Sequence, residues 1–246
     1  MLSLLQDFST TIFNTTTSLV SKCILASMGW TPINQETFDN IEEHKRLVLV
    51  FSHTSYADFY IVLLYFLAYP YQLRNVRMLV KPQPFAYAGW LLRKFGAIPA
   101  TKVEEKQGGA TKRIVDDLNS SNKCVFLVSP KGTIVNAPWR SGYYHIAQGI
   151  KADLMVAGLD YEKKQVVVID KSISSSIEHE AVEKHLKEQM GQIVPLFPDE
   201  EVVPIRQHNN KLRSILDLMQ MFKVFISGTL SIILYWQFKK YFSLYL

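Results

Sequence analysis

Short apolar runs alternate with amphipathic stretches through the middle of the chain. The runs predict strands at Leu47–Phe51, Val76–Val80, Val125–Val128, Leu154–Leu159 and Gln165–Ile169. The stretches between and after them predict helices at Phe59–Tyr69, Phe85–Phe95, Ala110–Asn119, Ser141–Gln148 and Ile177–Met190. Ser175 and Glu178 are spaced as a capping box for the last of these helices. This alternation predicts an α/β fold, in which a central mixed, largely parallel sheet is flanked by helices.

The two ends of the chain are its apolar parts. Residues 2–30 carry hydrophobic side chains at helical spacing, which predicts an amphipathic helix; Asp7 and the missing basic n-region argue against a cleaved signal peptide. Val224–Phe238 is uncharged, and its 15 residues cover about 22 Å of helix against a hydrocarbon core of about 30 Å. Both a membrane span and an in-plane or core-packed helix therefore stay open.

These features divide the chain into three regions. Residues 1–40 form a membrane-associating amphipathic region, residues 41–210 the α/β domain, and residues 211–246 an apolar helix that associates with or anchors in a membrane. The polar stretch Gly191–Asn210 with its three prolines connects the last two regions.

Composition excludes several classes of protein. The 246 residues are 48% hydrophobic and 20% charged, which excludes a disordered chain and a polytopic transporter. Cys23 and Cys124 are the two cysteines, too few for a disulfide framework or a zinc finger. No cluster of His, Cys and Asp has the spacing of metal ligands, so we expect no metal site.

The net charge of +5 is unevenly distributed. Arg74–Lys151 contains 13 Lys and Arg against 4 Asp and Glu, a net charge of +9, which leaves −4 for the rest of the chain. The basic residues form no dense run with interleaved aromatics, so we do not expect a nucleic acid as partner. A smaller anion, such as a phosphate or coenzyme A, fits a positive middle segment equally well.

The first predicted strand ends at a histidine that is followed by an aspartate. Within one helix, His53 and Asp58 would lie about 140° apart and could not touch. If His53 lies in the loop and Asp58 in the first helical turn, the carboxylate can orient the imidazole, whose other nitrogen can remove a proton. A loop or core histidine with a structural hydrogen bond is the alternative. The chain has no Gly-x-Ser-x-Gly elbow, so a hydroxyl of the substrate would be the nucleophile.

A second candidate site follows the strand at Val125–Val128. There the chain reads Ser129-Pro-Lys-Gly-Thr133, in which the glycine permits close backbone approach and exposed N–H groups can hold an anion. A plain β-turn is the alternative reading.

The order of these motifs resembles the glycerolipid acyltransferase superfamily, which includes glycerol-3-phosphate, 1-acylglycerol-3-phosphate and lysophospholipid acyltransferases. The resemblance covers about residues 45–170 and includes the His-x4-Asp pattern at His53 and Asp58. Further segments that match the family are Lys81 with Gly89–Pro99, Ser129–Thr133, Pro138–Ala147 and Val156–Tyr161. The implied fold is glycerol-3-phosphate acyltransferase-like.

The resemblance implies a role for each matching residue. His53 would be the general base that deprotonates the acceptor hydroxyl, and Asp58 would orient it. The implied substrate-binding residues, which hold the acceptor phosphate, are Lys81, Lys102, Lys131, Gly132, Thr133 and Arg140. No cofactor is implied; acyl-CoA or acyl carrier protein would be the co-substrate.

Two departures from the family pattern affect the expected activity. Where the family's third motif has Glu-Gly-Thr-Arg, this chain has Lys131 and Ile134, and Ala86 stands where the second motif usually has proline. Arg140 could replace the missing arginine. Because His53 and Asp58 are both present, we favour an active enzyme over a catalytically silent lipid-binding protein of the same fold.

The sequence therefore predicts an O-acyltransferase associated with the cytosolic face of a membrane. Its expected partners are the lipid surface, an acyl donor, and a glycerol phosphate or lysophospholipid acceptor, with 1-acylglycerol-3-phosphate as the first candidate. A CoA-independent phospholipid transacylase is the alternative within the same chemistry.

Overall fold

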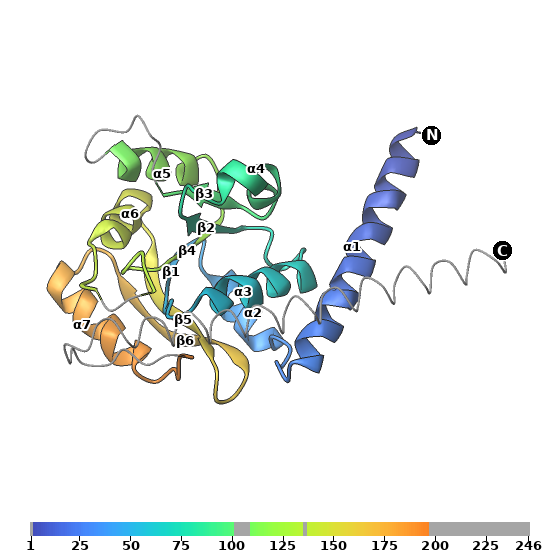
Figure 1. Cartoon of the computed structure of the whole chain (residues 1–246). Coiled ribbons are helices and arrows are strands. Elements are labelled where there is room, and N and C mark those ends of the chain that lie inside the picture. Colours follow the sequence, from blue (N-terminus) through green and yellow to red (C-terminus); the bar gives the residue numbers. More distant parts are fainter. Residues whose placement is uncertain (1, 101–108, 135–136, 197–246) are drawn as a thin grey trace. The chain divides into compact units, whose positions relative to one another are not determined.

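The computed structural model describes residues 2–100, 109–134 and 137–196 (Figure 1). The predicted C-terminal helix within residues 211–246 and the candidate residue Lys102 lie outside this part of the chain. No helix among the described residues is both long and apolar enough to cross a membrane.

The chain divides into two compact units, and the first contains two described helices. They are α1 (Leu2–Ser27) and α3 (Tyr56–Ala68), and they pack against each other. The Ser18 hydroxyl donates a hydrogen bond of 2.6 Å to the Ala68 carbonyl oxygen. The Tyr65 hydroxyl donates another, also of 2.6 Å, to the Thr31 carbonyl oxygen. The helix predicted at the N-terminus is thus present as α1.

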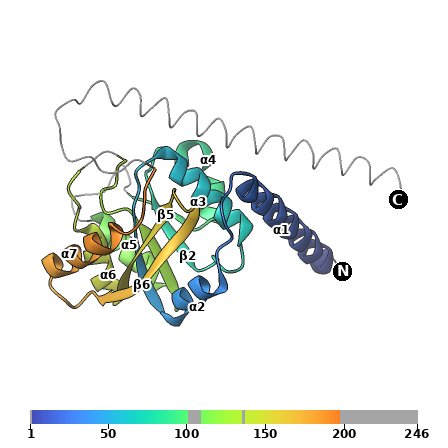
Figure 2. The same ribbon diagram turned by 90° about the horizontal axis from the view of Figure 1, so that it is seen from below.

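The second unit contains a six-stranded sheet in the order β3-β2-β4-β1-β5-β6 (Figures 1 and 2). The strands are β1 (Arg46–Phe51), β2 (Val76–Val80), β3 (Ala97–Pro99), β4 (Cys124–Val128), β5 (Asp153–Asp160) and β6 (Gln165–Ser174). The first five run parallel to one another, and β6 runs antiparallel to β5. This confirms the predicted α/β fold with a mixed, largely parallel sheet.

Helices of the second unit share a hydrophobic core with one face of this sheet. They are α5 (Gly109–Asn119), α6 (Gly142–Ile150) and α7 (His179–Met190). Alternate side chains of the central strands enter this core, among them Val48 and Val50 of β1 and Leu154 and Val156 of β5. All four are fully buried, so the register of the strands is fixed by which face each residue must bury.

Two short elements were not predicted, and one predicted cap is wrong. The additional elements are α2 (Gln35–Glu43) and β3. The capping box expected from Ser175 and Glu178 is absent, because α7 begins at His179 and its N-cap residue Glu178 makes no side-chain capping hydrogen bond. Helix α4 (Phe85–Lys94) lies between β2 and β3 in the sequence and contacts β3.

Candidate functional site

The carboxyl ends of the central parallel strands bring several predicted site residues to one edge of the sheet. Val50 of β1 lies opposite Val128 of β4, and β2 pairs in parallel with β4. Therefore His53, two residues after β1, Lys81, directly after β2, and the turn that follows β4 all lie at the same edge.

At this edge the connections that leave the neighbouring strands β1 and β4 run in opposite directions across the sheet. From β1 the chain continues to β2, beyond β4, whereas from β4 it continues to β5, beyond β1. Ligands of open α/β sheets bind outside the carboxyl ends of strands at such a switch point. The strand order thus independently favours the place where the sequence motifs gather.

The connection after β1 contains the histidine. Ser52 extends the strand, because its backbone N–H donates a hydrogen bond of 3.4 Å to the Ala157 carbonyl oxygen of β5. His53 follows and is half-buried, while Thr54 beside it is 2% exposed. The histidine therefore stands in a loop that begins at a fixed strand end, as the sequence predicted.

Asp58 lies in the first turn of α3 and forms a capping box with Ser55. Its Oδ2 accepts a hydrogen bond of 3.0 Å from the Ser55 backbone N–H, while the Ser55 Oγ accepts one of 3.0 Å from the Ala57 N–H. The carboxylate is 2% exposed and lies at the positive end of the helix dipole, which favours its charge. Asp58 belongs to the first unit and His53 to the second, and their pairing stays a prediction.

The motif after β4 forms a tight turn. The Gly132 N–H donates a hydrogen bond of 3.1 Å to the Ser129 carbonyl oxygen, and Gly132 has a φ of +63°. Apart from its chain neighbours, no described residue has an atom within 4 Å of where a β-carbon on Gly132 would stand, so a ligand can approach the backbone there. Lys131 and Thr133 on either side are half-buried.

Arg140 is held beside this turn by its main chain. Its backbone N–H donates a hydrogen bond of 3.0 Å to the Pro130 carbonyl oxygen, and its side chain is exposed. The chain therefore returns to the turn at the residue expected to replace the arginine that Ile134 displaces. Sequence reasoning proposed this substitution but provided no contact to support it.

Ser129 carries a polar group that the sequence did not single out. Its Oγ is buried and has no hydrogen-bond partner among the described residues. A buried hydroxyl without a partner is uncommon in a folded protein, and this one belongs to the first residue of the turn. Its place in the motif was visible in the sequence, but its lack of a partner required the structure.

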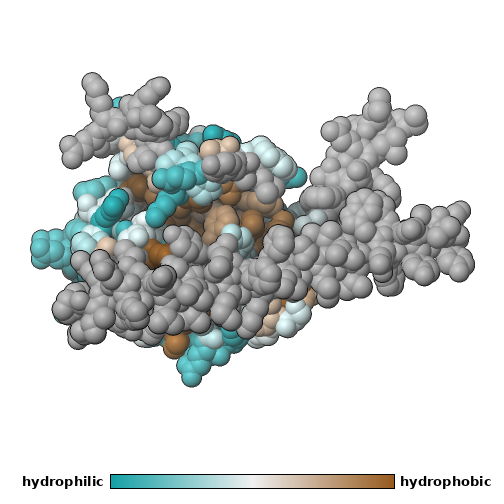
Figure 3. Space-filling model, viewed as in Figure 1, coloured by the Kyte–Doolittle hydropathy of each residue, from teal (hydrophilic) through white to brown (hydrophobic). Residues whose placement is uncertain are grey.

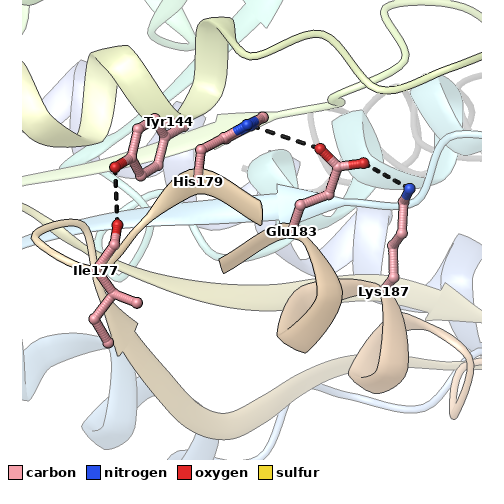
Figure 4. Close-up of polar contacts among 5 residues, drawn as sticks. All are labelled: Tyr144, Ile177, His179, Glu183 and Lys187. Carbon is pink, nitrogen blue, oxygen red and sulfur yellow. Dashed lines mark hydrogen bonds and ion pairs between the residues drawn. The ribbon is translucent and has the colours of Figure 1, made fainter. Parts of the chain in front are cut away.

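The segment that follows Arg140 is supported by α7 (Figure 4). The Tyr144 hydroxyl donates a hydrogen bond of 2.8 Å to the Ile177 carbonyl oxygen, and the rings of Tyr144 and His179 lie 4.9 Å apart. The Glu183 Oε2 lies 3.6 Å from the His179 Nε2, and the Glu183 Oε1 forms an ion pair of 2.6 Å with the Lys187 Nζ. Packing against α7 thus holds the start of α6, and with it the residues next to Arg140.

Tyr143 adds a neutral buried group to this support. Burial, and then the charge of Glu183, raise the pKa of its phenol far above the ordinary value. Its hydroxyl has no hydrogen-bond partner within the described ranges, and its ring meets Trp139 edge-on with 5.7 Å between centroids. The phenol therefore stays protonated and packs as an aromatic side chain rather than supplying charge to the site.

The edge carries a histidine and several positive side chains. Lys81 and Arg140 are exposed and Lys131 is half-buried, so three positive side chains come from segments at or beside the edge that follows β1. Such side chains form charge-assisted hydrogen bonds with phosphate. No group of three His, Cys, Asp or Glu residues in the described segments could hold a metal ion.

A comparison with known families agrees with this arrangement. The sequence model of the acyltransferase family matches residues 32–170, more than half of the chain. The chain belongs to the acyltransferase family. This confirms the resemblance, and the matched range contains every candidate site residue. Compared with curated proteins, the chain has no significant match.

Two of the described helices of this acyltransferase lie outside the matched range. Helix α1 precedes it, and α7 follows it. The contacts that α7 makes with the segment after Arg140 are therefore features of this chain beyond the part that the family model matches.

Proposed function

We propose that the protein is a membrane-associated O-acyltransferase that transfers a fatty acyl group from acyl-CoA or acyl carrier protein. The acceptor is the hydroxyl of a glycerol phosphate or lysophospholipid, with 1-acylglycerol-3-phosphate as the first candidate. Family membership supports acyl transfer, and the positive side chains at the carboxyl edge support an anionic acceptor.

In this proposal His53 is the general base. One ring nitrogen takes the proton of the acceptor hydroxyl, and the resulting oxygen nucleophile attacks the thioester carbonyl carbon. The new C–O bond forms, the C–S bond breaks, and the thiolate leaves with the proton from the imidazolium. Asp58 orients the imidazole and stabilises its charged form, as a carboxylate does in other His-Asp pairs.

The positive side chains and the turn after β4 have separate roles in this proposal. Lys81, Lys131 and Arg140, together with Lys102, bind the acceptor phosphate, and the N–H groups around Gly132 and Thr133 steady the negative charge on the thioester oxygen. The single observation that supports an active enzyme rather than a silent protein is the hydrogen bond from the Arg140 backbone N–H to the Pro130 carbonyl oxygen. It supplies an arginine beside a turn in which Ile134 has displaced the family's own.

The test is turnover by the purified full chain with labelled acyl-CoA and a panel of acceptors. We expect ester product that falls by about 10²–10⁴-fold in His53→Ala, the usual contribution of a general base. His145→Ala, which removes an exposed histidine on α6, is the matched control and should retain full activity. Equal activity of His53→Ala and wild type would contradict the mechanism.

The same assay separates the alternatives. Product formed from a phospholipid donor, but not from acyl-CoA, would identify a CoA-independent transacylase. Lack of turnover with every donor and acceptor would favour a silent lipid-binding protein, the reading that Lys131 and Ile134 support. The proposed location, the cytosolic face of a membrane, follows from where acyl-CoA is found and is tested by localising the tagged protein.

A further inference from the structure

Helix α4 carries an exposed tryptophan among positive side chains. Trp90 is 74% exposed, more than any other large hydrophobic side chain in the described part of the chain. Arg93 and Lys94 are also exposed, and they follow Trp90 by three and four residues. Positions at these spacings share one face of a helix, so the tryptophan and both cations project together.

The stretch of sequence that contains this face carries only positive charges. Between residues 71 and 100 the chain has five Lys and Arg and no Asp or Glu. One of them, Lys81, is exposed directly after β2, and the Arg93 guanidinium lies 5.5 Å from the centre of the Phe85 ring. Figure 3 shows apolar and hydrophilic side chains next to each other on the face of the molecule drawn in Figure 1.

We propose that the exposed face of α4, defined by Trp90, Arg93 and Lys94, docks on the surface of an anionic phospholipid bilayer. Tryptophan is enriched at the level of lipid head groups, where its ring is half apolar and its N–H finds a polar partner. Lys and Arg are attracted to the negative potential of an anionic leaflet. The combination on one helix face matches this chemistry.

The position of α4 gives the docking a consequence for the proposed function, on which this second step rests. The chain enters α4 soon after Lys81, at the carboxyl edge of the sheet, and α4 contacts β3 at the outer side of β2. Docking through α4 therefore keeps Lys81, which lies four residues before the helix, near the head groups, where a lipid acceptor with an anionic group would lie.

The first test is flotation of the purified full chain with vesicles of phosphatidylcholine, with and without phosphatidylglycerol. Arg93→Gln/Lys94→Gln should bind the anionic vesicles at least about tenfold more weakly, as expected for two interfacial charges. Lys171→Gln/Lys184→Gln is the matched control, because it removes two exposed lysines on β6 and α7 and should bind as wild type does. Equal binding by both double variants would overturn the proposal.

The second test follows Trp90 itself and needs no acyl transfer. Lipids brominated in their acyl chains should quench part of the tryptophan emission of wild type, and that part should be missing in Trp90→Phe. The other described tryptophans are buried or half-buried, which limits their contact with lipid. Identical quenching in both proteins would overturn the docking.

Self-association is measured alongside. If Trp90→Ala changes the oligomeric state but leaves vesicle binding intact, the face binds a protein and the proposal is wrong. Since vesicle binding is read without substrates, its failure differs from failure of the proposed acyl transfer. The latter is read with soluble short-chain acceptors in the absence of vesicles.

Discussion

Gly96 shows how a single residue fixes the path of the chain between α4 and β3. It has a φ of +74° just after α4, and an added β-carbon would stand 2.4 Å from the Val76 carbonyl oxygen. Gly132 in the turn after β4 has a similar φ of +63°, but no described residue other than its chain neighbours has an atom within 4 Å of its own β-carbon position. The two glycines therefore separate backbone strain from steric overlap.

We predict that Gly96→Ala lowers the free energy of unfolding by about 2–4 kcal/mol, because left-handed strain and overpacking add. Gly132→Ala should cost only about 1–2 kcal/mol, because the strain acts alone. Urea unfolding followed by circular dichroism measures both. Equal losses in the two variants would show that the β2 backbone gives way and that no steric overlap exists.

At the scale of elements, the strands were predictable and the shortest pieces were not. The run Leu47–Phe51 is apolar throughout because this central parallel strand is buried on both faces, and that pattern is distinctive. Helix α2 buries only Phe38 and Ile41, and β3 has three residues, so neither is long enough to show a period.

The helix caps also show the limit of prediction from local spacing. Ser175 and Glu178 have the spacing of a capping box but do not form one, whereas Ser55 and Asp58 form one before α3. Spacing alone therefore does not decide where a helix begins. For the same reason the motifs located the turn after β4 and Arg140, but only the fold supplied the hydrogen bond between Arg140 and Pro130.

The capping box of α3 allows the structural role of Asp58 to be separated from the chemical one. Asp58→Asn keeps an oxygen that can accept from the Ser55 N–H but loses the charge, so the protein should fold while acyl transfer falls sharply. Ser55→Ala keeps the carboxylate but loses an N-cap, at a cost of about 1 kcal/mol in the free energy of unfolding. Its rate should stay near that of wild type. Parallel losses of stability and rate in both variants would assign Asp58 a purely structural role.

At the scale of the whole molecule, the two cysteines probe the two compact units separately. Cys23 lies on α1 in the first unit and is exposed, whereas Cys124 begins β4 in the second unit and is 1% exposed. Burial raises the pKa of the Cys124 thiol, and this outweighs the opposite effect of Arg77 and Arg46. Less thiolate at a given pH, together with burial, makes Cys124 a poor nucleophile in the folded protein.

We therefore expect a thiol reagent at mildly alkaline pH to label Cys23 rapidly in the native protein and to leave Cys124 unmodified. In a Cys23→Ser variant, labelling of Cys124 should begin only as urea unfolds the sheet, with the same midpoint as the loss of far-ultraviolet circular dichroism. The reason is that β4 is a central strand, paired on both sides by β2 and β1, so exposing its first residue requires breaking the sheet. Labelling of Cys124 without urea at a rate near that of Cys23 would mean that β4 opens locally, and the turn it positions would then be mobile as well.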